Sequence, residues 1–169
     1  AIVPLGITLQ FALVGSGVIK DKAAVDAMSR SGDRREILRG PLYYGVAFIL
    51  LTILFWRNFP VGIVALMMLC GGDGLADVIG KRINSPSLPW SPNKSLAGSV
   101  SMLLGGFTLS LFILWIFIHQ GYFVSPISYY VVPVGIIAIV TSVIESLPIK
   151  DIDNITVPLA AVLVGLIVF

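Results

Sequence analysis

Residues 95–144 read SLAGSVSMLLGGFTLSLFILWIFIHQGYFVSPISYYVVPVGIIAIVTSVI, and this stretch contains no Asp, Glu, Lys or Arg. A helix needs about 20 apolar residues to cross a hydrocarbon core of about 30 Å, so the stretch is long enough for two crossings. Polar and turn-forming residues at 119–122 and 125–126 divide it into two apolar halves. It therefore predicts two transmembrane helices, at about 96–118 and 127–147.

The whole chain has the composition of a membrane protein. Of its 169 residues, 57% are hydrophobic and 12% are charged, and the mean hydropathy is +0.98. Further apolar runs predict spans at about 1–19, 40–56, 60–80 and 154–169. We therefore expect an all-α, polytopic integral membrane protein with about six transmembrane helices in a single membrane-embedded domain, residues 1–169.

Other features of the composition narrow the class of protein. The chain opens in apolar sequence, without an initiator Met or a preceding basic segment. We therefore interpret the first run as a helix rather than a signal peptide, and we expect the chain to be truncated at its N-terminus. Cys70 is the single cysteine, which excludes a disulfide within the chain. The net charge of +2 is too small to indicate nucleic acid as a partner.

The charged residues collect on one predicted side of the membrane. If six helices alternate in direction, the loops 20–39, 81–95 and 148–153 share one side, which then carries ten of the eleven Lys and Arg residues. Arg57 is the exception. The positive-inside rule places this side in the cytoplasm or its organellar equivalent. All nine carboxylates lie on the same side or at the helix ends nearest to it.

Two aspartates stand near the end of the third predicted span, in GGDGLADVIGKR (71–82). A helix that begins at residue 60 reaches Asp73 after about 20 Å and Asp77 after about 26 Å. A carboxylate at the centre of a bilayer helix costs about 2.5–3.5 kcal/mol, so such a residue usually has a function. Residues four apart share a helix face, where both carboxylates could hold a hard cation such as Mg²⁺. The alternative is that Asp77 pairs with Lys81.

Small residues form a stripe beside the two aspartates. Gly72, Ala76 and Gly80 follow one another at intervals of four residues. Such a stripe allows another helix or a ligand to approach the backbone closely.

The loop before the fourth predicted span has the residues of a phosphate site. Lys94 and Ser95 open the helix, and Gly98 and Ser99 lie in its first turn. Free backbone N–H groups and the positive end of the helix dipole attract anions at such a position. No GxxxxG precedes the lysine, so the loop is not a P-loop. The alternative is a juxtamembrane lysine followed by a serine N-cap.

Further polar residues lie next to predicted spans. Arg39 immediately precedes the second span and could contact phosphate, whereas Arg34 and Arg35 suit anionic lipid headgroups better. Glu145 lies near a helix end and Asp153 just beyond it, and Glu145 is hard to explain as a solvent-facing residue.

Four blocks of the sequence together resemble the phytol kinase and farnesol kinase group of the polyprenol (dolichol) kinase family. These blocks are LRGPLYY (38–44), CGGDGLADVIGKR (70–82), PWSPNKSLAGSVSM (89–102) and ESLPIKDIDNITVPL (145–159). The resemblance implies a multi-pass membrane enzyme that transfers the γ-phosphate of CTP, or of another nucleoside triphosphate, to a long-chain isoprenoid alcohol. Phytol is the first candidate, with phytyl phosphate as the product for tocopherol or prenylquinone synthesis. An Arg-Lys-x-x-His block of the family is absent here.

The resemblance also implies where the enzyme works and which partners it has. It implies a plastid envelope or a cyanobacterial membrane, with the active face on the stromal or cytoplasmic side. The expected partners are an isoprenoid alcohol from the bilayer, a nucleoside triphosphate and membrane lipids.

The residues and the resemblance combine in one predicted site. Asp73, Asp77 and Asp153 are expected to bind Mg²⁺, and Glu145 to bind a second metal or act as general base. The residues expected to bind the nucleotide phosphates are Lys94, Ser95, Gly98, Ser99, Arg39 and Arg82. Phosphoryl transfer depends mainly on positioning and charge neutralisation, which these groups could supply.

Other functions remain open from the sequence. A phosphatidate cytidylyltransferase-like enzyme would also use CTP, and a farnesol, geranylgeraniol or dolichol kinase would use a different alcohol. The DGxxAR pattern of CDP-alcohol phosphotransferases begins as residues 73–76 do, but Asp77 replaces its arginine. An ion-coupled transporter would place its carboxylates near the membrane midplane, whereas these acids cluster towards one face.

Overall fold

The computed structural model describes residues 1–29, 31–55, 58–148 and 152–169. Among these residues, four helices are long and apolar enough to cross a membrane. The four are Arg34–Leu54, Pro60–Arg82, Leu96–His119 and Ile127–Glu145. Two shorter apolar helices, Ile2–Ser16 and Asp153–Val168, complete the set at the predicted positions. The chain is an all-α polytopic membrane protein, as predicted.

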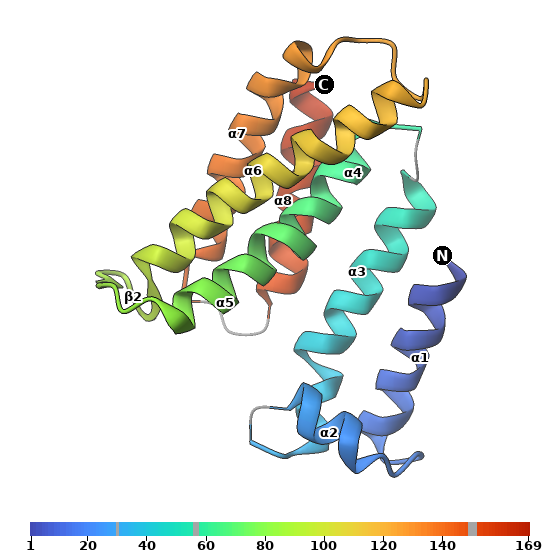
Figure 1. Ribbon diagram of the computed structural model, residues 1–169. Coiled ribbons are helices and arrows are strands. Elements are labelled where there is room, and N and C mark those ends of the chain that lie inside the picture. Colours follow the sequence, from blue (N-terminus) through green and yellow to red (C-terminus); the bar gives the residue numbers. More distant parts are fainter. Residues whose placement is uncertain (30, 56–57, 149–151) are drawn as a thin grey trace.

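The elements alternate between long helices and short connections (Figure 1). The long helices are α1 (Ile2–Ser16), α3 (Gly40–Leu54), the continuous run of α4 (Pro60–Met67), η2 (Met68–Asp73) and α5 (Gly74–Arg82), then α6 (Leu96–His119), α7 (Ile127–Glu145) and α8 (Asp153–Val168). The short connections are α2 (Lys22–Met28), the 3₁₀ helix η1 (Arg34–Leu38) and the strands β1 (Ser87–Leu88) and β2 (Ser91–Ser95).

Short local structures occupy the segments that were expected to be loops. Asp21 caps α2 by accepting a hydrogen bond from the Ala24 amide at 3.0 Å, and Asp33 caps η1 by accepting one from the Arg35 amide at 2.9 Å. Strands β1 and β2 pair antiparallel as a small hairpin just before α6. Aspartate is a favoured N-cap because its carboxylate satisfies an amide that has no partner in the helix.

The helices form two groups (Figure 1). Helices α4 to α8 make one bundle, in which α6 packs against α5 and α7, and α7 against α8. Helices α1 and α3 pack against each other beside this bundle, and α3 reaches it through contacts with α4 and α8. At the α1–α3 contact, a Cβ atom on Gly45 would clash with Oγ1 of Thr8, so the close approach requires glycine.

The interior of the bundle is apolar, and so is much of its surface. Met68, Met102 and Leu114 are fully buried between the helices. On the outside, Val132 is 68% exposed and Leu163 is 56% exposed. Apolar side chains on the outer face are what a surrounding bilayer requires.

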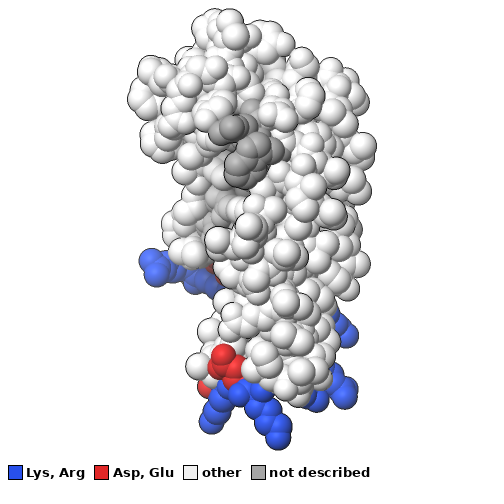
Figure 2. Space-filling view, turned by 90° about the vertical axis from the view of Figure 1, so that its right-hand side faces the viewer, with Lys and Arg blue, Asp and Glu red and all other residues white. Residues whose placement is uncertain are grey.

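The polar connections lie at one end of the molecule. Figure 1 places α2, the β-hairpin, the end of α7 and the start of α8 towards one end, and the end of α3, the start of α4 and the α6–α7 connection towards the other. Figure 2 shows charged side chains gathered towards one end of that face. The predicted alternation of the helices is thus confirmed for the described residues. Of the charged residues considered above, Arg30, Arg57, Lys150 and Asp151 lie outside these residues.

A π-helical segment, η2, interrupts the long helix that carries the aspartates, and the sequence did not predict it. Two of its glycines face α6, where a Cβ on Gly71 or Gly72 would meet side chains of that helix. At Gly72 the Cβ would lie 2.7 Å from Sδ and 3.1 Å from the carbonyl oxygen of Met102. The predicted close approach along the small-residue stripe is therefore made by a helix, α6. π-Helical segments of this kind occur frequently at functional sites.

Candidate active site

A cleft of about 1500 Å³ lies between the α1–α3 pair and the bundle. Its lining brings together residues that are distant in the sequence and that the sequence analysis selected. These are Arg39, Asp73, Asp77, Lys94, Ser95, Gly98, Ser99, Glu145 and Asp153. Arg82, the last residue of α5, is exposed and does not line the cleft. The cleft is larger than the roughly 300–1000 Å³ typical of a small-molecule pocket.

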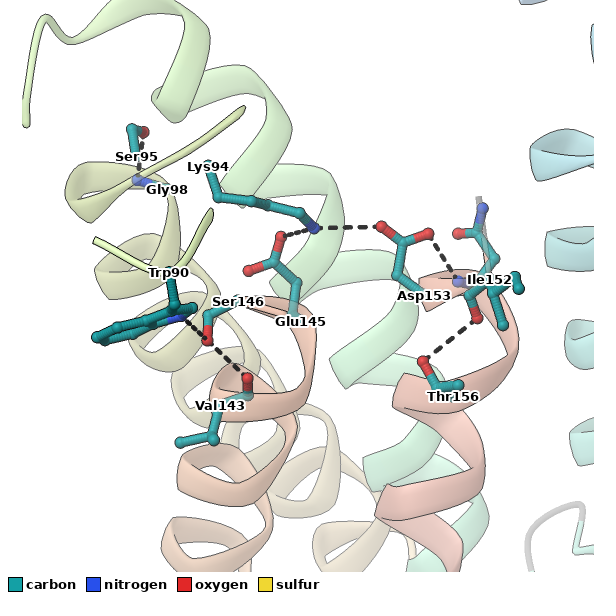
Figure 3. A network of polar contacts seen from close by, with 11 residues as sticks. Trp90, Lys94, Ser95, Gly98, Val143, Glu145, Ser146, Ile152, Asp153 and Thr156 are labelled. Atoms are coloured by element: carbon teal, nitrogen blue, oxygen red, sulfur yellow. Dashed lines mark hydrogen bonds and ion pairs between the residues drawn. The ribbon is translucent and has the colours of Figure 1, made fainter. Parts of the chain in front are cut away.

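Lys94 is the centre of an ion-pair network in this cleft (Figure 3). Its Nζ lies 2.5 Å from Oε1 of Glu145 and 3.2 Å from Oδ2 of Asp153. Lys94 comes from β2, Glu145 is the last residue of α7, and Asp153 is the first of α8. The network therefore ties the hairpin to two helix ends through charge-assisted hydrogen bonds, which are stronger than neutral ones.

The electrostatic surroundings keep Lys94 positively charged. Burial alone would lower the pKa of its ammonium group. The hydrogen bond to Glu145 and the negative charges of Glu145 and Asp153 outweigh burial, so the pKa of Lys94 lies above its ordinary value. Lys94 is therefore a cation at neutral pH and can neutralise a phosphate.

Glu145 keeps one carboxylate oxygen available for a ligand. The residue is 5% exposed, and its Oε1 binds Lys94, but its Oε2 is buried and has no hydrogen-bond partner among the residues that the structure describes. A buried acceptor without a partner costs free energy, and native proteins seldom leave one without a reason. Oε2 is thus the atom of the network best placed to receive a proton or to bind a cation.

The start of α6 has the predicted serine N-cap and also the backbone amides of the predicted phosphate site. Ser95 is the N-cap, because its Oγ accepts a hydrogen bond from the Gly98 amide at 3.2 Å. The Ala97 amide donates to Oγ of Ser85 at 3.0 Å. The predicted serine cap is confirmed. Phosphate binding by the Gly98 amide stays a prediction, and it requires that the Ser95 hydroxyl give way to the ligand.

The two aspartates on the long helix have different surroundings. Asp73 ends η2, is partly buried, and interacts electrostatically with Asp153, Glu145 and Lys94. Asp77 is exposed and forms an ion pair with Lys81 at 2.6 Å between Nζ and Oδ2. The pairing of Asp77 with Lys81 is therefore confirmed, whereas the role of Asp77 as a metal ligand is untested; the pairing favours Asp73 for that role. Asp73 is the aspartate of the pair that faces the Lys94 network.

The carboxylates fit a magnesium ion that arrives with phosphate better than a preformed metal site. In the part of the chain that the structure describes, no three His, Cys, Asp or Glu side chains form a group that could hold a metal. Mg²⁺ usually takes one or two protein carboxylates and fills its other positions with water and phosphate oxygens. Asp73, Asp153 and the free oxygen of Glu145 are donors of the right kind. Their role as magnesium ligands stays a prediction.

Two hydrogen bonds that the sequence does not indicate hold this end of the molecule together. Nε1 of Trp90 in the hairpin donates a hydrogen bond to Oγ of Ser146 at 3.2 Å, next to Glu145 (Figure 3). Nδ2 of Asn154 donates to the carbonyl oxygen of Gly40 at 3.2 Å, which joins α8 to the start of α3. These partners are far apart in the sequence, so no local pattern could indicate them.

The fold and the cleft define a polytopic membrane protein with a lysine–carboxylate site towards one end of its helices. Over 158 residues the chain is 44% identical to "Probable phytol kinase 3, chloroplastic" of Glycine max, covering 92% of this chain and 49% of that protein. It is 37% identical over 171 residues to "Phytol kinase 1, chloroplastic" of Arabidopsis thaliana, covering 100% and 56%. It is 40% identical over 159 residues to "Farnesol kinase, chloroplastic" of the same plant, covering 93% and 52%.

The chain is thus a homologue of the phytol kinase and farnesol kinase group, and the resemblance noted in the sequence is confirmed. It spans about half the length of the curated relatives it matches. No protein-family model matches the chain, and no solved structure matches it significantly.

Proposed function

We propose that the protein to which this chain belongs transfers the γ-phosphoryl group of a nucleoside triphosphate to an isoprenoid alcohol. CTP is the proposed donor and phytol the first candidate acceptor, with phytyl phosphate as the product. The observation that carries this proposal is the similarity of nearly the whole chain to proteins named phytol kinase and farnesol kinase. The cleft supports it, because it holds a cationic lysine and carboxylates beside apolar helices.

The proposed reaction is a direct displacement at phosphorus. The alcohol oxygen attacks the γ-phosphorus, a new P–O bond forms, and the bond to the β,γ-bridging oxygen breaks to release a nucleoside diphosphate. The hydroxyl proton passes to a carboxylate or to water. Such a transition state needs positioning and charge neutralisation more than covalent help. The positive charges of a lysine and a magnesium ion would therefore be enough to stabilise it.

Four charged residues of the cleft have a proposed part. Asp73 and Asp153 would hold Mg²⁺, which neutralises the phosphate charge when it is bound. Lys94 would exchange one of its contacts with Glu145 and Asp153 for a contact with a phosphate oxygen. Glu145 would take the hydroxyl proton or bind a second metal through Oε2, the oxygen for which the described part of the chain supplies no partner.

The charged end of the molecule would face the compartment that supplies the nucleotide. The relatives are named chloroplastic, and a plastid or cyanobacterial membrane is the proposed location. By the positive-inside rule the site would open on the stromal or cytoplasmic side. Phytyl phosphate made there would serve tocopherol or prenylquinone synthesis.

Labelled CTP tests the proposal in isolated membranes that contain the full-length protein. Phytol, farnesol, geranylgeraniol and dolichol are each supplied with CTP that carries the label on either the γ- or the α-phosphate. We expect γ-label in a lipid-soluble phosphate and no α-label in lipid. Entry of α-label would instead indicate a cytidylyltransferase, and no label in lipid with any alcohol would contradict the proposal.

A further inference from the structure

One wall of the cleft is largely apolar and comes from two adjacent helices. On α1 it presents Val3, Ile7 and Phe11, and on α3 it presents Gly40, Tyr44 and Phe48. Each set follows a four-residue interval, which keeps side chains on one face of a helix. We call these six residues the α1–α3 wall. None of them was selected as a site residue from the sequence.

The α1–α3 wall is continuous and is fixed beside the polar site. Thr8 and Gly45 pack together where the two helices meet. The hydrogen bond from Asn154 to Gly40 joins the polar end of the wall to α8, one residue after Asp153. Towards that end of the wall, the Tyr44 hydroxyl lies beside the Cys70 thiol and near Asp73. The polar site and the apolar wall therefore belong to one cleft.

The depth of the wall limits what it can bind. Phe48 lies eight positions after Gly40 on the helix, a rise of about 12 Å, which is less than half of a hydrocarbon core of about 30 Å. A long apolar chain whose polar head lay at the Lys94 network would touch the wall with its first part. The remainder of that chain would extend into the bilayer.

We propose that the α1–α3 wall binds the hydroxyl-proximal part of the isoprenoid tail, and that Ile7, Phe11 and Phe48 determine which alcohols are accepted. This inference rests on the proposed function. An apolar tail gains little by leaving lipid for protein, so recognition depends on packing rather than on the hydrophobic effect. Poor fit of a single methylene group changes the rate by about tenfold or more, which is enough for selection.

A bulky substitution at the wall tests the inference, because it should change the ratio of kcat/KM between a long and a short alcohol. Ile7→Trp narrows the cleft where a longer tail passes, and geraniol, half as long as phytol, serves as the short acceptor. We expect kcat/KM for phytol to fall about tenfold relative to geraniol. Leu9→Trp is the matched control, because Leu9 lies on the same helix, is 58% exposed and does not line the cleft. The control should leave the ratio unchanged.

The outcomes separate the two proposals. If wild-type protein phosphorylates no isoprenoid alcohol, the proposed function fails. If wild type phosphorylates phytol and Ile7→Trp leaves the phytol-to-geraniol ratio unchanged, the tail site is wrong and the function stands. Activity of Ile7→Trp on geraniol shows that the variant is folded.

Photo-labelling tests the same site without a substitution. A phytol analogue with a diazirine near its hydroxyl is irradiated in membranes that contain the full-length wild-type protein. We expect labelled peptides that contain Phe11 or Tyr44, and we expect unlabelled phytol to displace the label. Label confined to lipid-facing residues such as Val132 or Leu163, or label that phytol does not displace, would overturn the inference.

Discussion

Removing Lys94 should expose how strongly the site depends on its ion pairs. Lys94→Ala leaves Glu145, whose side chain is 6% exposed, without its cation. Breaking a buried pair in this way usually costs about 3–5 kcal/mol. The Lys94 side chain is 22% exposed, so water can partly replace its ammonium group beside Glu145. We therefore expect the free energy of unfolding to fall by a value near the lower limit, about 3 kcal/mol.

A second substitution shows whether the loss comes from the unpaired carboxylate. In Lys94→Ala/Glu145→Gln both charges of the pair are gone, and we expect a loss of only about 1 kcal/mol, about 2 kcal/mol less than for Lys94→Ala alone. Lys81→Ala is the control, because its pair with Asp77 is exposed and contributes at most about 0.5 kcal/mol.

Unfolding of the purified full-length variants in detergent measures these differences, and phosphate transfer is measured in parallel. We expect transfer to be lost in both Lys94 variants, because the charge is missing in each. If the stability effects of Lys94→Ala and Glu145→Gln simply add, the two side chains do not interact and the network is wrong. Full activity of the double variant would show that Lys94 does not neutralise phosphate.

Three further expectations follow from the same end of the molecule. Trp90→Phe removes the hydrogen bond to Ser146 and should raise KM for the nucleotide several-fold while the protein stays folded; steady-state kinetics with an unchanged KM would contradict this. Gly98→Leu should destabilise the protein by about 1–3 kcal/mol, because a Cβ there would lie 3.2 Å from the Ala76 carbonyl oxygen, and unchanged thermal unfolding would count against the α5–α6 contact. The folded pKa of Lys94 is raised, so its stabilisation is complete below the unfolded value of about 10.5 and is lost only as pH rises through the folded value. The stability difference between wild type and Lys94→Ala should therefore be constant from about pH 7 to 9, and a difference that shrinks in that window would refute the pairing.

The helices could be predicted from the sequence because the length of an apolar run is a strong signal in a membrane protein. The span expected at 96–118 is the helix Leu96–His119, and the span expected at 127–147 is Ile127–Glu145. The π-helical segment could not be predicted in this way. It depends on how Gly71 and Gly72 pack against α6, and such packing leaves no periodic pattern in the sequence.

The candidate site was predictable in its parts but not in its connections. The pairing of Asp77 with Lys81 was recognisable because the residues are four apart on one helix. Lys94 pairs with Glu145 and Asp153, which lie 51 and 59 residues away. Charge sidedness placed these three residues at the same end of the helices, but only the packing of the helices determines which atoms meet.

The apolar wall was missed for a different reason. In a membrane protein, residues such as Ile7 and Phe48 look the same whether they face lipid, another helix or a substrate. The sequence therefore contains no signal that distinguishes them, and the arrangement of α1 and α3 around the cleft is what selects them.

The most direct test of the central claim compares two aspartates: Asp73, the last residue of η2, and Asp77 in α5. Asp73 faces the Lys94 network, whereas Asp77 pairs with the exposed Lys81. The measurement is γ-phosphate transfer from labelled CTP to phytol in membranes with equal amounts of full-length Asp73→Asn or Asp77→Asn protein. We predict that Asp73→Asn abolishes transfer and that Asp77→Asn keeps activity within about threefold, as expected for loss of a surface pair. Undiminished transfer by Asp73→Asn would contradict the account.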